Sequence, residues 1–144
     1  MIPFDELYQE QDAISELTQV ITALIQKRRL CDNRITNQLF NQFTEMVNKH
    51  LDRESQLVCS CLLTSHNKEA VKHAMRSLEG GKEIKRIFNQ FVRKWFRKGS
   101  LHIKEHSLFV QEAEEMVELV LDRFQTETEI LYPLARKECE IRSL

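Results

Sequence analysis

Residues 32–63 read DNRITNQLFNQFTEMVNKHLDRESQLVCSCLL, and the fold class follows from this stretch. It contains neither glycine nor proline, and its apolar side chains recur at spacings of three and four, as on one face of an α-helix. Asp32 and Asn33 supply side-chain oxygens that can cap a helix N-terminus. The stretch therefore predicts one long amphipathic helix that ends near Leu63.

Three further segments show the same helical periodicity and are separated by short polar breaks. They span approximately residues 4–27, 68–98 and 109–134. Adjacent Gly80 and Gly81 are expected to bend or interrupt the third helix, unless another group needs the space. Gly99 suits the position that follows a helix C-terminus, and Pro133 marks a bend or an end in the last helix. Four such helices predict an all-α, up-down-up-down four-helix bundle.

The composition agrees with a helical fold. The chain has 144 residues, of which three are glycine and two are proline, too few for the turns of a β-sandwich or barrel. This length predicts a single domain over residues 1–144. No apolar run is long enough to cross a membrane, and the acidic N-terminus lacks a secretory core, so a cytoplasmic protein is expected. The four cysteines, which form no zinc-binding pattern, are expected to be reduced thiols.

Charge gives no indication of a nucleic-acid partner. The formal net charge is −1, so no global field attracts nucleic acid or an anionic membrane. Residues 82–98 contain seven basic side chains, but residues 105–129 contain eight acidic ones. The two segments are expected to complement each other within the bundle.

Polar residues stand where the helical period demands apolar ones. On the second helix, His50 and Glu54 occupy consecutive core positions one turn apart. Arg123 and Glu127 repeat this spacing on the last helix, and Gln11 lies on the core face of the first. An unpaired buried carboxylate is costly, so these residues predict an internal site that contains a cation or a proton.

The sequence resembles the hemerythrin-like, or HHE cation-binding, domain. The residues that carry the resemblance are His50-Leu-Asp-Arg-Glu54, which matches the H-x-x-x-E of the family's second helix, and Glu127 followed by Leu131-Tyr-Pro133, which matches its closing E-x-x-x-L-[FY]-P. The resemblance implies a four-helix bundle that can hold a non-haem di-iron centre. It also implies a role in sensing or storage related to oxygen, iron or redox state.

Several of the family's metal ligands are replaced in this chain. Gln11 and Arg123 stand where the first and last helices of the family carry histidine, and Ser77 or Gly81 stands at the third-helix position. The favoured interpretation is a metal-free site in which Arg123 bridges Glu54 and Glu127 with His50 nearby. The alternatives are a residual metal site, with non-haem iron held by His50, Glu54 and Glu127, and solvent-exposed positions for some of these residues.

Two functions are compatible with these residues. The first is a hemerythrin-like sensing or regulatory module with a degenerate cation site. The second is a helical protein-binding regulator, because Leu121-Asp-Arg-Phe124 followed by Glu127 resembles the regulators of sigma factor D. A protein partner is possible in both cases, and no nucleophile–base pair or phosphate loop predicts an enzyme. His102 and His106 are expected to be solvent-exposed.

Overall fold

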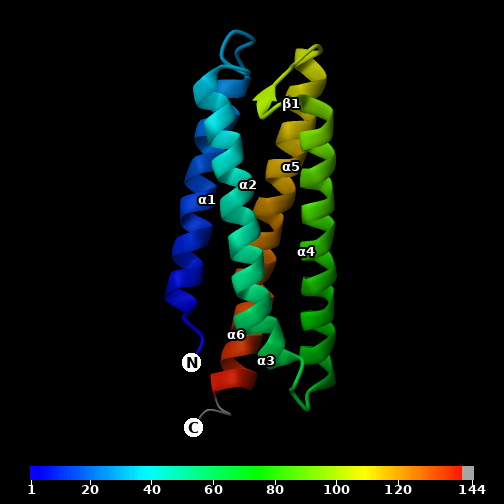
Figure 1. Ribbon diagram of the computed structural model, residues 1–144. Coiled ribbons are helices and arrows are strands. Elements are labelled where there is room, and N and C mark those ends of the chain that lie inside the picture. Colours follow the sequence, from blue (N-terminus) through cyan, green and yellow to red (C-terminus); the bar gives the residue numbers. More distant parts are fainter. Residues whose placement is uncertain (141–144) are drawn as a thin grey trace.

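The computed structural model describes residues 1–140, and the prediction of one domain over residues 1–144 extends to four residues outside that part. Four long helices dominate the described chain and lie side by side (Figure 1). They are α1 (Phe4–Ile25), α2 (Arg34–Glu54), α4 (Lys68–Trp95) and α5 (His106–Thr126). The prediction of an all-α fold is therefore confirmed, apart from one small hairpin.

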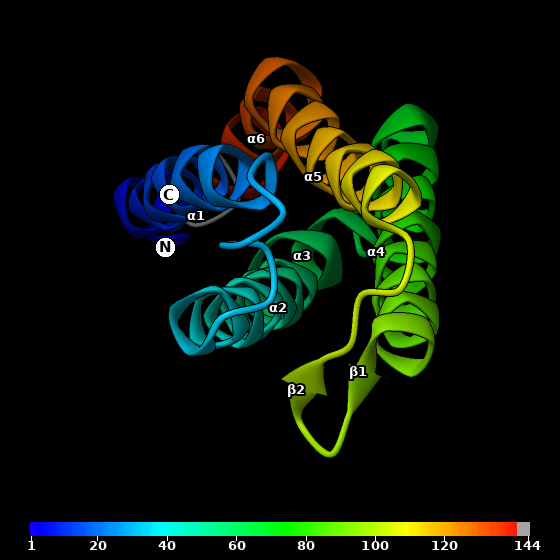
Figure 2. The same cartoon turned by 90° about the horizontal axis from the view of Figure 1, so that it is seen from above.

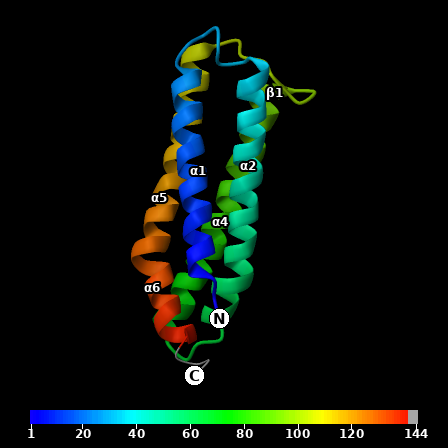
Figure 3. The same cartoon turned by 90° about the vertical axis from the view of Figure 1, so that its left-hand side faces the viewer.

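The helices stand at the corners of a four-cornered arrangement when seen from above (Figure 2). Helices α1 and α4 each contact both α2 and α5. The N-terminal end of α1 and the short helix α6 (Tyr132–Ala135) lie at the same end of the molecule (Figure 3). All four long helices can therefore direct side chains into one shared interior.

Caps set where the helices begin. The side chain of Asn33 accepts a hydrogen bond from the backbone N–H of Thr36 at the start of α2, which confirms the predicted cap. Asn67 caps α4 in the same way, through the N–H of Glu69. Both asparagines satisfy an N–H group that has no partner within its helix.

Helices α2 and α5 each continue into a π-helical segment. Helix α2 continues into the π-helical segment η1 (Ser55–Cys59) and the short α3 (Ser60–Leu62). Helix α5 continues into the π-helical segment η2 (Glu127–Leu131), then α6, then a third π-helical segment, η3 (Arg136–Glu140). Glu54 is the last residue before η1, and Glu127 is the first residue of η2. Both carboxylates therefore sit at the edge of a π-helical turn, a feature that is frequent at functional sites.

Of the two sequence-based expectations about glycine, the one for Gly99 is wrong. Helix α4 runs without interruption through Gly80 and Gly81, which leaves the alternative that another group needs the space there. Gly99 does not end a helix, because α4 stops at Trp95 and a hairpin of β1 (Phe96–Arg97) and β2 (Ser100–Leu101) follows. Lys98 and Gly99 form the two-residue turn with φ of 54° and 80°, the left-handed conformation that such tight hairpins require.

The apolar core consists of two clusters. The larger lies toward the hairpin and contains Phe40, Phe91 and Phe109, whose rings pack against one another. The smaller lies toward the start of α1 and α6 and surrounds Tyr132, which packs against Phe4 and Tyr8. Along α1, for example, Leu7 belongs to the smaller cluster and Ile14 to the larger. Between the two clusters lies a layer of polar side chains.

Candidate functional site

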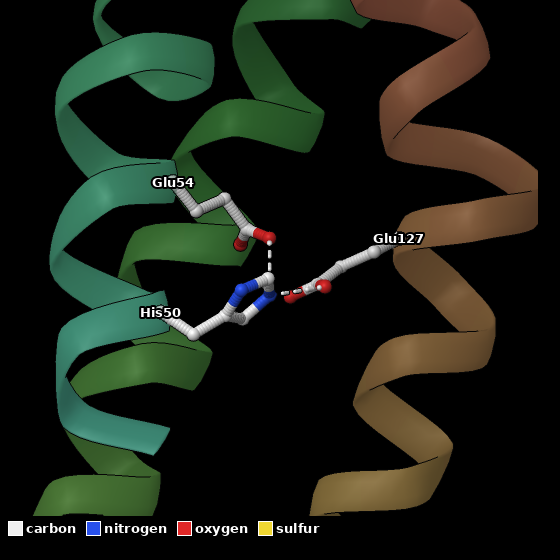
Figure 4. A group of neighbouring side chains, drawn as sticks. All are labelled: His50, Glu54 and Glu127. Atoms are coloured by element: carbon white, nitrogen blue, oxygen red, sulfur yellow. Dashed lines mark hydrogen bonds and ion pairs between the residues drawn. The ribbon is translucent and has the colours of Figure 1, made fainter. Parts of the chain in front are cut away.

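This polar layer brings together all five residues that were predicted from the sequence to share a site. They are Gln11 of α1, His50 and Glu54 of α2, Arg123 of α5 and Glu127 of η2. His50, Glu54 and Glu127 are each at most 1% exposed, and the Arg123 side chain is 13% exposed. Figure 4 shows His50 and Glu54 on one helix, directed toward Glu127 on the facing one.

Arg123 links the two buried carboxylates. Its Nη2 donates to Oε1 of Glu54 at 2.5 Å, and its Nε donates to Oε2 of Glu127 at 2.9 Å. Two more hydrogen bonds reach α4, from Nη1 to the carbonyl oxygen of Ser77 at 2.8 Å and from Nη2 to its hydroxyl at 2.9 Å. The guanidinium thus fixes the relative position of three helical runs.

Gly80 provides the space that the guanidinium occupies. A Cβ atom added at Gly80 would lie 3.0 Å from Nη1 of Arg123, whereas one added at Gly81 would meet no atom closer than 3.8 Å. The interpretation that another group needs the space at this glycine pair therefore holds for Gly80. Only glycine lets the arginine lie against the backbone of α4 without displacement.

His50 lies between two carboxylates. Its Nε2 is 2.9 Å from Oε1 of Glu127 in the core, and its Nδ1 is 2.8 Å from Oε1 of Glu10 at the rim of the layer. Ionised carboxylates only accept hydrogen bonds, so both contacts are satisfied when the ring carries two protons. Burial lowers the pKa of His50, but hydrogen bonds with Glu127 and Glu54 outweigh burial and raise the pKa to about 10. The imidazole is a second cation in the layer.

The carboxyl groups differ in their proton affinity. Burial alone would raise the pKa of Glu54, but the hydrogen bond with His50 and the charge of Arg123 lower the pKa to about 2. Burial raises the pKa of Glu127. Its oxygens nevertheless accept hydrogen bonds from Gln11 at 2.7 Å and from Arg123, so donors surround the ionised form. Glu54 is the more acidic of the two.

Tyr132 belongs to the layer, although its role was not predicted from the sequence. Its hydroxyl lies 2.8 Å from Oε2 of Glu54 and 3.1 Å from Oε1 of Glu127. Burial raises the pKa of Tyr132 far above its ordinary value, so the phenol keeps its proton and donates. The sequence signal was the position of Tyr132 five residues after Glu127, but a tyrosine there is equally compatible with simple apolar packing.

Glu10 and Arg53 connect the layer to the surface and were also missed. Arg53 donates to both Glu10 and Glu6, and these side chains are between 25% and 60% exposed. The available signal was the spacing of four between Glu6 and Glu10, which places both carboxylates on the same side of α1. The second nitrogen of His50 is thus held by an ion pair at the molecular surface.

The layer is electrically balanced by its own side chains. His50 and Arg123 supply two positive charges, and Glu54 and Glu127 supply two negative charges. His50, Glu54 and Glu127 could together hold a metal ion, because one ligand atom from each lies within 4.8 Å of the others. A divalent cation would give the layer the same zero net charge only if His50 lost its extra proton and the Arg123 guanidinium moved out of the layer. As arranged, Arg123 already supplies a positive charge to both carboxylates.

Other predicted residues lie at or beyond the edge of the layer. Ser77, which accepts hydrogen bonds from Arg123, also lines a surface pocket of about 260 Å³ that reaches Glu127. His102 is exposed, but His106 is only partly so. Its Nε2 donates to the carbonyl oxygen of Ile25, the last residue of α1, at 2.7 Å, which corrects the expectation of a solvent-exposed side chain. Of the residues in Leu121-Asp-Arg-Phe124, Leu121 and Asp122 are exposed and Phe124 is buried.

The expectation of four reduced thiols is wrong. Cys61 and Cys139 form a disulfide, with Cα atoms 6.2 Å apart, and only Cys31 and Cys59 carry free thiols. Spacing along the sequence gave no indication of this pair, because 78 residues separate the two cysteines. Both free thiols are at most 1% exposed, and burial raises the pKa of each.

The helices within residues 1–140 include none with the combination of length and apolarity that crossing a membrane requires. Comparisons of the chain with protein-family models, with curated proteins and with solved structures gave no match. What the polar layer can do thus follows from its own residues and their geometry.

Proposed function

We propose that the chain is an up-down-up-down four-helix bundle of the hemerythrin-like kind, in which Arg123 takes the place of a metal cation. The order of the long helices and the convergence of His50, Glu54 and Glu127 from two facing helical runs support this assignment. The π-helical turns that begin at the two carboxylates support it as well.

One observation carries the proposal: a single guanidinium donates to Glu54 and to Glu127. A planar, permanently charged group with several donors can replace a cation between two carboxylates. The chain is then neither an oxygen carrier nor an enzyme, but a regulatory module related to oxygen, iron or redox sensing that acts through its surface.

Metal analysis tests the proposal. Wild-type protein, freshly purified and then incubated with Fe²⁺ or Zn²⁺, is expected to retain much less than one metal ion per chain after desalting. Arg123→Ala is expected to retain about one ion, because His50, Glu54 and Glu127 then lack their competing cation. The matched control is Arg123→Ala combined with Glu54→Gln, which removes one ligand and is expected to abolish the gain.

The opposite pattern would overturn the proposal. Near-stoichiometric non-haem iron in the wild type, lost in Glu54→Ala, would assign a residual metal site to His50, Glu54 and Glu127. Absence of metal in both the wild type and Arg123→Ala would mean that the arginine does not exclude a cation.

The second candidate is a protein-binding regulator similar to the regulators of sigma factor D. The observation in its favour is that Leu121 is 37% exposed and stands beside exposed Asp122 on α5. A stable complex with an RNA polymerase subunit that is lost in Leu121→Asp but kept in Val92→Asp, an exposed position on α4, would support this function. Equal binding by both variants would exclude this surface.

A further inference from the structure

The disulfide joins the ends of the two helical runs that carry the polar layer. Cys61 lies in α3, about two turns beyond Glu54 along the run that starts with α2. Cys139 lies in η3, about two turns beyond Tyr132 along the run that starts with α5. The disulfide is therefore a covalent link between the segment that carries Glu54 and the segment that carries Tyr132.

The link is reachable from solvent. A surface pocket of about 260 Å³ is lined by Cys61 and Cys139 together with Ile2, Gln56 and Leu57. Cys61 is partly exposed and Cys139 is 9% exposed. The free thiol of Cys59 is 1% exposed although it is only two residues from Cys61. A small thiol can thus approach the disulfide while the remaining thiols stay inaccessible.

We propose that Cys61–Cys139 is a reversible thiol–disulfide exchange site whose substrate is a low-molecular-weight thiol. The thiolate of that molecule attacks Sγ of Cys61, forms a mixed disulfide and releases Cys139 as a thiolate, which takes up a proton. A second small thiol then attacks the sulfur of the first small molecule in the mixed disulfide. This step releases Cys61 as a thiolate, which takes up a proton, and forms the small disulfide. Two small thiols are oxidised to one small disulfide, and the protein disulfide is reduced to two thiols by the same two electrons.

Reduction is coupled to the polar layer through Tyr132. The smaller apolar cluster contains both Cys139 and Tyr132, and the Tyr132 hydroxyl donates to Glu54. After reduction, the segment over residues 132–140 keeps non-covalent attachments, among them the hydrogen bonds from Ser65 and Asn67 to Glu138 at 2.9 Å. It loses the covalent one. Local unfolding of α6 therefore costs less free energy, and this unfolding also breaks the hydrogen bond from the Tyr132 hydroxyl to Glu54.

A redox titration of the wild-type protein tests the exchange. The folded protein is equilibrated with mixtures of reduced and oxidised glutathione, quenched with acid, alkylated in denaturant and weighed by mass spectrometry. We expect the number of alkylated thiols to rise from two to four in one two-electron transition, with the new labels at Cys61 and Cys139. Reduction that occurs only after denaturation, or four labels in fully oxidised buffer, would overturn the proposal.

Hydrogen exchange tests the coupling. Reduction is expected to speed amide exchange in Tyr132–Ala135 by about tenfold or more, and Cys139→Ser is expected to do the same without reductant. Cys31→Ser is the matched control, because Cys31 is buried in the larger cluster and forms no disulfide. Reduction with unchanged exchange in α6 would refute the coupling. Neither readout depends on whether Arg123 or a metal ion fills the layer, so this inference and the proposed function can fail separately.

Discussion

Nη2 of Arg123 lies 2.5 Å from Oε1 of Glu54, although 69 positions separate the two residues and they belong to different helices. The contact is inside the molecule, where Glu54 is 0% exposed. A charge-assisted hydrogen bond in such a place is strong, and the loss of either partner leaves the other charge buried and unpaired. The stability of the bundle is therefore sensitive to this one side chain.

Arg123→Ala is expected to lower the free energy of unfolding by about 3–5 kcal/mol, because both Glu54 and Glu127 lose their cation. Urea denaturation at neutral pH measures the change. Arg93→Ala is the control, since Arg93 is an exposed arginine within helix α4. A loss in Arg123→Ala no larger than that in Arg93→Ala would mean that the guanidinium does not stabilise the layer.

The two glycines of α4 are expected to respond oppositely to alanine. Gly81→Ala should stabilise the protein by about 0.5–1 kcal/mol, because alanine favours a helix and the new Cβ would have ordinary contacts. Gly80→Ala should not stabilise the protein, because the new Cβ would press on Nη1 of Arg123. The Arg123 guanidinium makes four hydrogen bonds that hold it in place.

A double-mutant cycle isolates the cause of this difference. Gly80→Ala introduced together with Arg123→Ala is expected to stabilise relative to Arg123→Ala alone. If Gly80→Ala destabilises equally in both backgrounds, the crowding does not come from the arginine. Thermal or urea unfolding of the four proteins gives the coupling energy.

Protonated His50 predicts a loss of stability in alkaline solution. Its pKa is raised from 6.5 to about 10 in the folded protein, so its contribution is fully present below pH 6.5 and is lost as the pH rises through 10. The loss is expected to be on the order of 3–5 kcal/mol. Urea denaturation from pH 6 to pH 10 measures it, and ¹⁵N NMR of the imidazole measures the pKa directly. In His50→Gln the alkaline decline should be much smaller; a decline equal to that of the wild type would assign it to other groups.

Tyr132→Phe is expected to lower the free energy of unfolding by about 1–2 kcal/mol, because the variant keeps the ring but removes the donor to the buried Glu54 carboxylate. Tyr8→Phe serves as the control, since Tyr8 packs against the same ring at the partly exposed edge of the cluster. Equal effects of the two substitutions on urea unfolding would show that the Tyr132 hydroxyl contributes no more than a surface one.

The sequence allowed the helices, the cap at Asn33 and five residues of the polar layer to be predicted, because all of these depend on local spacing up to Glu54 and Glu127. Beyond those residues the prediction failed. A regular helix would place Leu57 and Cys61 on the core face, but the structure buries Val58 and Leu62.

The reason is the extra residue in each π-helical turn, which rotates all later side chains around the axis by about 100°. Ile130 lies three residues after buried Glu127, on the same face of a regular helix, but it is 44% exposed, whereas Tyr132 and Ala135 are buried. The same rotation carries Cys61 to the edge where Cys139 lies, which is why the disulfide could not be inferred from a regular helical pattern. Side-chain periodicity does not reveal a π-helical turn, since the turn results from packing between helices.

The polar layer also acts as an alignment mark between the helices. If α5 slid along α2 by one turn, about 5.4 Å, Arg123 would move away from Glu54 and each charge would face apolar neighbours. Leucine and phenylalanine tolerate such shifts because one apolar contact replaces another. Charged pairs do not tolerate such shifts, because they match at only one position along the helix axis. The layer therefore destabilises packings in which a helix is shifted along its axis or has changed places with another helix, although the apolar faces alone would be nearly interchangeable.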